Sequence, residues 1–171
     1  MRSNLFRIFC VAIMLFPVLA LAAGTPPDLN NISLVNEDDP ARPYHLVDGR
    51  MTGDHLDIRV LKKAACDFDG DGLIDGVVIT LENYGGSGNF RVLNLLVNRR
   101  GRLVNTDRIQ LGDRVRVEDL RVGDSGKVEI DLLDRASGAP LAAAPKLKKR
   151  LVFQVEKEKL VPVPAPAGSK K

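Results

Sequence analysis

The chain has 171 residues, a formal net charge of +3, 5% aromatic residues and no tryptophan. Removing residues 1–22 lowers the charge to +1, because this segment holds two arginines and no acidic residue. A balanced charge and few aromatic rings argue against nucleic-acid binding and against platforms for stacked sugars. The 149 residues that remain match the usual size of one domain.

Residues 1–22 have the pattern of a secretory signal peptide. Two arginines precede an uncharged apolar run, Ile8 to Leu21, and small residues lead up to a cleavage site after Ala22. We predict cleavage there, or after Ala23, and a mature protein in the periplasm or outside the cell. A retained membrane anchor is the alternative, but it needs about 20 apolar residues and this run is shorter. After cleavage we expect no transmembrane segment.

Beyond the leader, short runs of valine, isoleucine and leucine alternate with charged residues and are separated by glycine, asparagine and aspartate. This period of two predicts strands rather than helices. In chain order, the predicted strands are 32–35, 44–47, 77–81, 90–97, 103–104, 115–118, 128–132, 151–155 and 160–161. The first two are expected to pair at an edge.

Many short strands separated by turn residues predict an all-β, antiparallel sandwich or barrel-like fold. We expect one such domain over residues 23–161. The Pro-rich residues 162–171 predict a disordered tail.

Residues 67–75 read D-F-D-G-D-G-L-I-D. Aspartates occupy loop positions 1, 3, 5 and 9, glycine occupies position 6, and a backbone carbonyl is available at position 7. These are the offsets of the oxygen ligands in calcium loops. We therefore predict a metal site whose ligands are Asp67, Asp69, Asp71, Asp75 and the carbonyl of Leu73.

Calcium is the ion that this loop is expected to bind. Its clustered carboxylates repel one another, and a hard divalent cation removes that repulsion. Calcium accepts six to eight oxygen ligands in irregular geometry, whereas magnesium demands a regular octahedron. A solvated acidic turn without metal is the alternative. Position 12 is Val78, where an EF-hand has a glutamate, so the loop is not an EF-hand.

The loop resembles the D-x-D-x-D-G-x-x-D calcium loops of FG-GAP repeats in integrin-type β-propellers, and less closely those of dockerin and thrombospondin type 3 repeats. A propeller repeats the motif in each blade, and this chain has one copy, so the resemblance does not imply a propeller.

A second resemblance adds Gly85–Gly88 (G-G-S-G) and Leu111–Arg114 (L-G-D-R), in this order after the acidic loop. It is to a group of small bacterial envelope proteins that share these motifs. This chain differs from that pattern at Cys66 and Asp69, where the group has glycine and asparagine. The resemblance implies export and a similar architecture, and it implies no activity.

No constellation of catalytic residues is evident. His45 and His55 stand in no metal-spaced cluster, and Ser87 lacks the strand–turn–helix context of a nucleophile. Cys66, the one cysteine after the leader, is expected to be a small buried residue in a strand.

We predict an exported, calcium-stabilised module that binds or scaffolds a partner protein or another envelope component, without catalysis. Two alternatives stay open. One is a calcium-dependent hydrolase, and the other is an inhibitor or assembly subunit that adds an edge strand to its partner.

Overall fold

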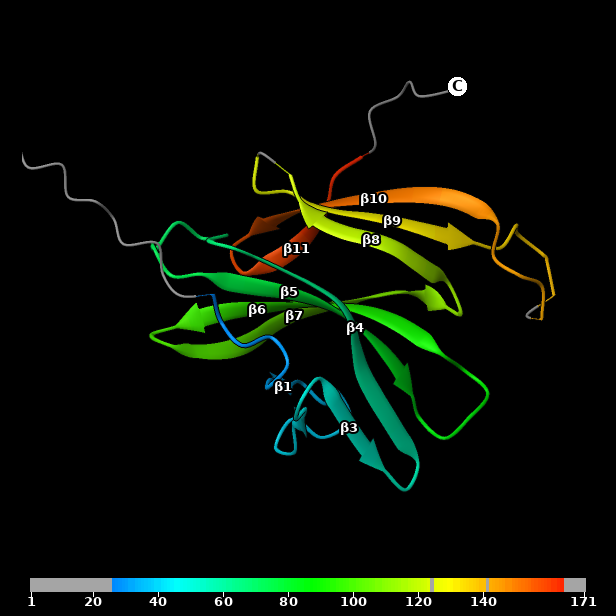
Figure 1. Ribbon diagram of the computed structural model, residues 1–171, viewed down its shortest axis with the longest axis horizontal. Coiled ribbons are helices and arrows are strands. Elements are labelled where there is room, and N and C mark those ends of the chain that lie inside the picture. Colours follow the sequence, from blue (N-terminus) through cyan, green and yellow to red (C-terminus); the bar gives the residue numbers. More distant parts are fainter. Residues whose placement is uncertain (1–25, 124, 141, 165–171) are drawn as a thin grey trace, which may run out of the picture.

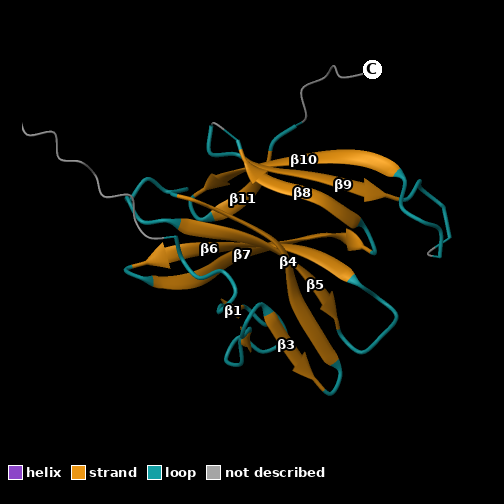
Figure 2. Ribbon diagram, in the orientation of Figure 1, coloured by secondary structure: helices purple, strands orange, loops and turns teal. Residues whose placement is uncertain are grey.

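The computed structural model describes residues 26–123, 125–140 and 142–164, which fold into strands, turns and loops (Figures 1 and 2). These residues form eleven strands in three antiparallel sheets. The described part of the chain holds no helix long and apolar enough to cross a membrane. The predicted leader lies outside the described residues, as do residues 165–171 of the predicted tail.

The larger sheet is a five-stranded meander in which each strand pairs with the next along the chain. Its strands are β3 (Arg50–Gly53), β4 (Leu56–Cys66), β5 (Asp75–Asn83), β6 (Phe90–Arg99) and β7 (Arg102–Asp113). Register shifts interrupt the pairing of β4 with β5 and of β6 with β7. Such bulges bend a strand and increase its twist.

A four-stranded sheet, called the smaller sheet below, has the order β11-β10-β9-β8. It lies over the larger sheet as a second layer (Figure 1). Its strands are β8 (Arg116–Val122), β9 (Val128–Asp134), β10 (Leu147–Glu156) and β11 (Lys159–Pro162). The predicted all-β, antiparallel fold, with the acidic loop between two strands, is confirmed. The predicted tail starts at Pro162, which here ends β11, and the N–H of Val163 donates to the carbonyl of Val152 at 2.8 Å.

One hydrophobic core lies between the two sheets. The larger sheet contributes Val77, Ile79, Leu93, Leu95 and Val97. The smaller sheet contributes Leu120, Val128, Ile130, Leu132, Phe153 and Leu160. Alternate residues of β5, β6 and β9 thus point into this core, because successive side chains of a strand point to opposite faces.

The N-terminal segment covers the other face of the larger sheet. In it β1 (Ser33–Leu34) pairs with β2 (Tyr44–His45), as predicted, but the pair forms a two-stranded sheet of its own rather than the edge of a larger sheet. The buried apolar residues of this second core are Leu29, Ile32, Leu34, Leu46, Ile58, Val78 and Leu96. Because β5 is covered on both faces, it reads as a continuous apolar run rather than an alternating one.

The sequence analysis delimits no strand between residues 47 and 77 and places only Cys66 in one, yet β3 and β4 lie there. The first half of β4, Leu56–Val60, alternates apolar and charged residues with the period of a strand, whereas Lys62–Ala65 in its second half are poor strand formers. Pairing with β5 over most of its length supplies the hydrogen bonds and the packing that Lys62–Ala65 do not favour by themselves.

Candidate metal centre

The acidic loop closes the hairpin between β4 and β5. Cys66 at the end of β4 pairs with Asp75 at the start of β5, so both ends of the loop are held by the sheet. Gly70 and Gly72 have φ values of +79° and +87°, and beyond the adjacent residues of the chain no atom lies within 4 Å of the place of a Cβ at either residue. Backbone conformation, rather than lack of space, therefore favours glycine at both positions.

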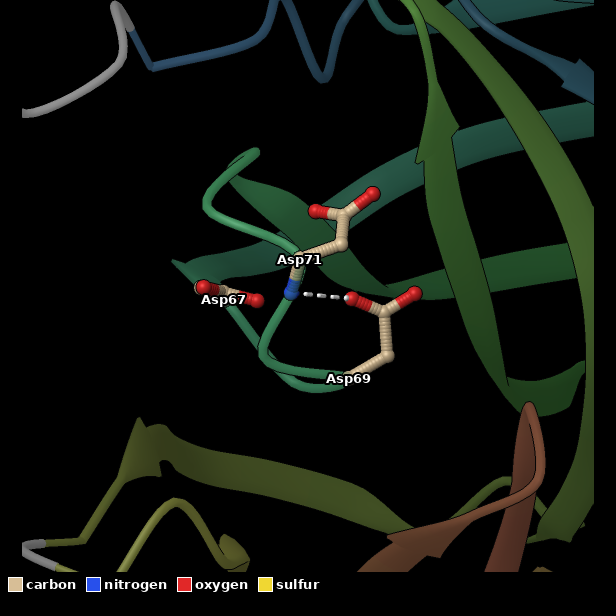
Figure 3. Close-up of side chains that lie close together, drawn as sticks. All are labelled: Asp67, Asp69 and Asp71. Carbon is tan, nitrogen blue, oxygen red and sulfur yellow. Dashed lines mark hydrogen bonds between the residues drawn. The ribbon is translucent and has the colours of Figure 1, made fainter.

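Asp67, Asp69 and Asp71 come together in this loop. One carboxylate oxygen of each lies within 4.8 Å of those of the other two, and Figure 3 shows the three side chains around the turn. Asp69 and Asp71 are exposed, and Asp67 is half-buried. Oxygen donors of this charge and spacing suit a hard divalent cation. The structure therefore supports an acidic triad as the candidate metal site.

Backbone hydrogen bonds hold these carboxylates in place. Asp67 accepts from the N–H groups of both loop glycines, at 2.8 and 2.9 Å. Asp69 accepts from the N–H of Asp71 at 3.1 Å, and Asp71 accepts from the N–H of Leu73 at 2.7 Å (Figure 3 draws the first of these two). Each carboxylate oxygen has a second lone pair, so these bonds are compatible with cation binding.

Asp75, the fourth predicted aspartate ligand, lies outside this cluster in a different environment. Its side chain is fully buried, and its two oxygens accept from the N–H of Phe68 at 2.9 Å and from the N–H of Asn98 at 2.8 Å. Burial raises the pKa of Asp75, and the two backbone hydrogen bonds oppose that rise. Asp75 thus ties the loop to β6.

Asn98 is a residue of this region that the sequence pattern does not single out. Its side-chain amide donates to the carbonyl of Ile74 at 3.0 Å, and its carbonyl oxygen accepts from the N–H of Gly101 at 2.8 Å. It therefore links the acidic loop to the β6–β7 turn. Leu73, whose carbonyl is the predicted fifth ligand, directly follows Gly72 within the loop.

Cys66 lies in a strand, as predicted, and is half-buried next to the acidic loop. Burial raises the pKa of its thiol, and the carboxylates of Asp67 and Asp75 raise it further. A thiol in this environment stays protonated and is a poor nucleophile. His45, in β2, contacts Ser33 of β1, with 2.8 Å between its Nδ1 and the Ser33 hydroxyl.

The G-G-S-G and L-G-D-R motifs contact each other at the opposite end of β5. Asp113 accepts a hydrogen bond from the N–H of Asn89 at 2.8 Å, and the N–H of Arg114 donates to the carbonyl of Asn89 at 2.8 Å. The guanidinium of Arg114 also donates to the carbonyl of Ser87. The second motif therefore fixes the loop that holds the first, and together they form a structural clasp.

Comparisons with protein-family models, with curated proteins and with solved structures find no match to this chain. Its likeness to calcium loops therefore rests on residues 67–75, and the function has to be argued from the site itself.

Proposed function

We propose that the mature protein is an exported binding or scaffolding module whose β4–β5 loop holds a calcium ion. The observation that carries this proposal is the convergence of Asp67, Asp69 and Asp71 to within 4.8 Å. In the proposed site the carbonyl of Leu73 adds a fourth oxygen, and water completes the six to eight ligands that calcium takes. Asp75 supports the site by its charge and by fixing the loop.

The role proposed for the ion is to stabilise the fold. The loop leads directly into β5, the strand that is buried on both faces. A cation there neutralises the repulsion among carboxylates at the start of this strand, and its binding free energy adds to folding stability. Val78, at loop position 12, is fully buried in the second core and offers no side-chain ligand.

Export is the second part of the proposal, and it rests on the pattern of residues 1–22. A periplasmic or extracellular location suits a calcium loop, since calcium sites of extracellular modules work at about 10⁻⁴–10⁻³ M. The expected partner is a protein or another component of the cell envelope.

Binding is favoured over hydrolysis by the groups that surround the triad. Catalysis at a bound cation needs a nucleophile or a general base beside it. Besides aspartate, the loop carries only phenylalanine, glycine, leucine and isoleucine. The neighbouring thiol of Cys66 is half-buried, and burial raises its pKa. These groups give the hydrolase alternative no reacting side chain at the triad.

The test is capture of partners from an envelope extract, with the wild type and an Asp69→Ala/Asp71→Ala double variant as baits. If the ion acts on stability alone, both baits retain the same partners under conditions where the variant is folded. Glu156→Ala, an exposed acid in the β10–β11 hairpin, is the matched control. Partners that bind only the wild type, and only with calcium, would place the ion in the interface and contradict a purely structural role. Calcium-dependent turnover of a substrate would contradict the proposal of a non-catalytic module.

A further inference from the structure

A pocket of about 300 Å³ opens on the face of the larger sheet that is turned away from the smaller sheet. Val92 and Arg108 are part of its lining. Leu93, the neighbour of Val92 in β6, lies in the core between the sheets, so Val92 points to the opposite face. The N-terminal segment contributes Glu37 and Asp38 to the same pocket.

Three aromatic rings line this pocket, from Tyr44, Tyr84 and Phe90. Tyr84 and Phe90 stand at the two ends of the loop that Asp113 and Arg114 clasp, and their ring centroids are 6.3 Å apart with the planes tilted by 42°. Tyr84 is 44% exposed, so part of its ring is open to a ligand. The clasp between the two sequence motifs thus positions two of the three rings.

A buried ion pair holds Tyr84 in place through its hydroxyl group. Glu82 is 1% exposed, and its carboxylate accepts from the hydroxyl of Thr80 at 2.7 Å, from the guanidinium of Arg108 at 2.7 Å and from the hydroxyl of Tyr84. Arg108 also donates to the carbonyl of Val35 at 3.1 Å, which holds the N-terminal segment against the sheet. The pocket is therefore pre-formed rather than a gap between loose loops.

The charges at this pocket do not balance. Arg108 contributes a positive charge to the lining of the pocket. Three carboxylates oppose it: Glu82, which is buried and pairs with Arg108, and Glu37 and Asp38, which belong to the lining. The Glu37 carboxylate is 3.7 Å from Nε of Arg108. The pKa of Tyr44 is raised by burial and then by the carboxylate of Asp38, which is consistent with an excess of negative charge here. Aromatic faces in a negative pocket are complementary to a cation.

We propose that this pocket binds a basic side chain, lysine or arginine, of a partner protein. The volume is at the lower limit for small-molecule sites, and the pocket is open to solvent, which suits one inserted side chain. The stem of the side chain would pack on the rings while its charged group meets the two exposed carboxylates. This inference rests on the proposed binding function, and it does not depend on the calcium ion.

The protein carries its own reporter for this site. The chain has two tyrosines and no tryptophan, and both tyrosines line the pocket. Tyrosine emission of the mature protein can therefore be followed while blocked tripeptides are added at constant ionic strength, with lysine, arginine or glutamine between two glycines. We expect a saturable change with the lysine or arginine peptide and none with the glutamine peptide. Equal responses to all three peptides, or no response to any, would overturn the proposal.

A pair of double variants tests the charge recognition. Glu37→Gln/Asp38→Asn should weaken binding of the basic peptide about fivefold, because it removes the two exposed carboxylates. Glu118→Gln/Asp119→Asn, on β8 of the other sheet, removes the same charge and should leave the affinity unchanged. Equal weakening by both variants would mean non-specific attraction and overturn the proposal. Calcium titration of the wild type separates this inference from the proposed metal site: a wild-type protein that binds calcium but none of the peptides rejects this inference alone.

Discussion

Replacing Arg108 by alanine is expected to lower the free energy of unfolding by about 3–5 kcal/mol. Arg108 is 14% exposed and pairs with Glu82, which is 1% exposed, so the substitution leaves a buried carboxylate without its counter-charge. It also removes the hydrogen bond to the carbonyl of Val35 that holds the N-terminal segment to the sheet. Urea unfolding of the mature protein, followed by circular dichroism, measures the loss.

An exposed ion pair provides the control. Arg99 and Glu158 are 2.7 Å apart but 56% and 38% exposed, so Arg99→Ala should cost less than about 1 kcal/mol. Should Arg108→Ala fail to fold, the double variant Glu82→Met/Arg108→Met serves instead. It leaves no unpaired charge and should be more stable than Arg108→Ala. A cost for Arg108→Ala as small as that of the control would contradict the importance of the buried pair.

Asp75→Ala is expected to cost about 2–4 kcal/mol in the presence of a calcium chelator, because it leaves two backbone N–H groups without acceptors. These are the groups of Phe68 and Asn98, which both bind the fully buried Asp75 carboxylate. Asp71→Ala, at an exposed position, should cost less than about 1 kcal/mol under the same conditions. Chemical denaturation with chelator and then with calcium measures both variants.

This comparison also decides how Asp75 acts. If Asp75 positions the loop, its substitution destabilises the protein with and without calcium. A variant that is nearly as stable as the wild type in chelator, yet gains nothing from calcium, would make Asp75 a direct ligand and contradict the positioning role.

The sequence indicates the strands whose own residues favour them. Val77–Leu81 and Phe90–Val97 are apolar because β5 and β6 are buried, so their composition reveals them. In β4 the residues Lys62–Ala65 are poor strand formers and depend on their pairing with β5, whereas Leu56–Val60 alternates with period two and carries a strand signal of its own. Local composition does not show the part of a strand that depends on its neighbour.

The same distinction applies to the two candidate sites. The spacing of Asp67, Asp69 and Asp71 predicts their convergence, because all three belong to one short loop turned by glycines. The contact of Asp75 with Asn98 depends on the pairing of β5 with β6, which a loop motif does not encode. The pocket beside Arg108 also needs the N-terminal segment folded onto the sheet, so no sequence motif reveals it.

Calcium binding is the most direct test of the proposed metal centre, by calorimetric titration of the chelator-treated mature protein. We predict one ion per chain with a dissociation constant of about 0.1–1 mM. At a calcium concentration of about 100 times that constant, stability should rise by about 2.7 kcal/mol. Asp69→Ala/Asp71→Ala should lose both effects, and Glu118→Gln/Asp119→Asn should keep them. No heat of binding, together with a melting temperature that calcium leaves unchanged, would contradict the calcium site.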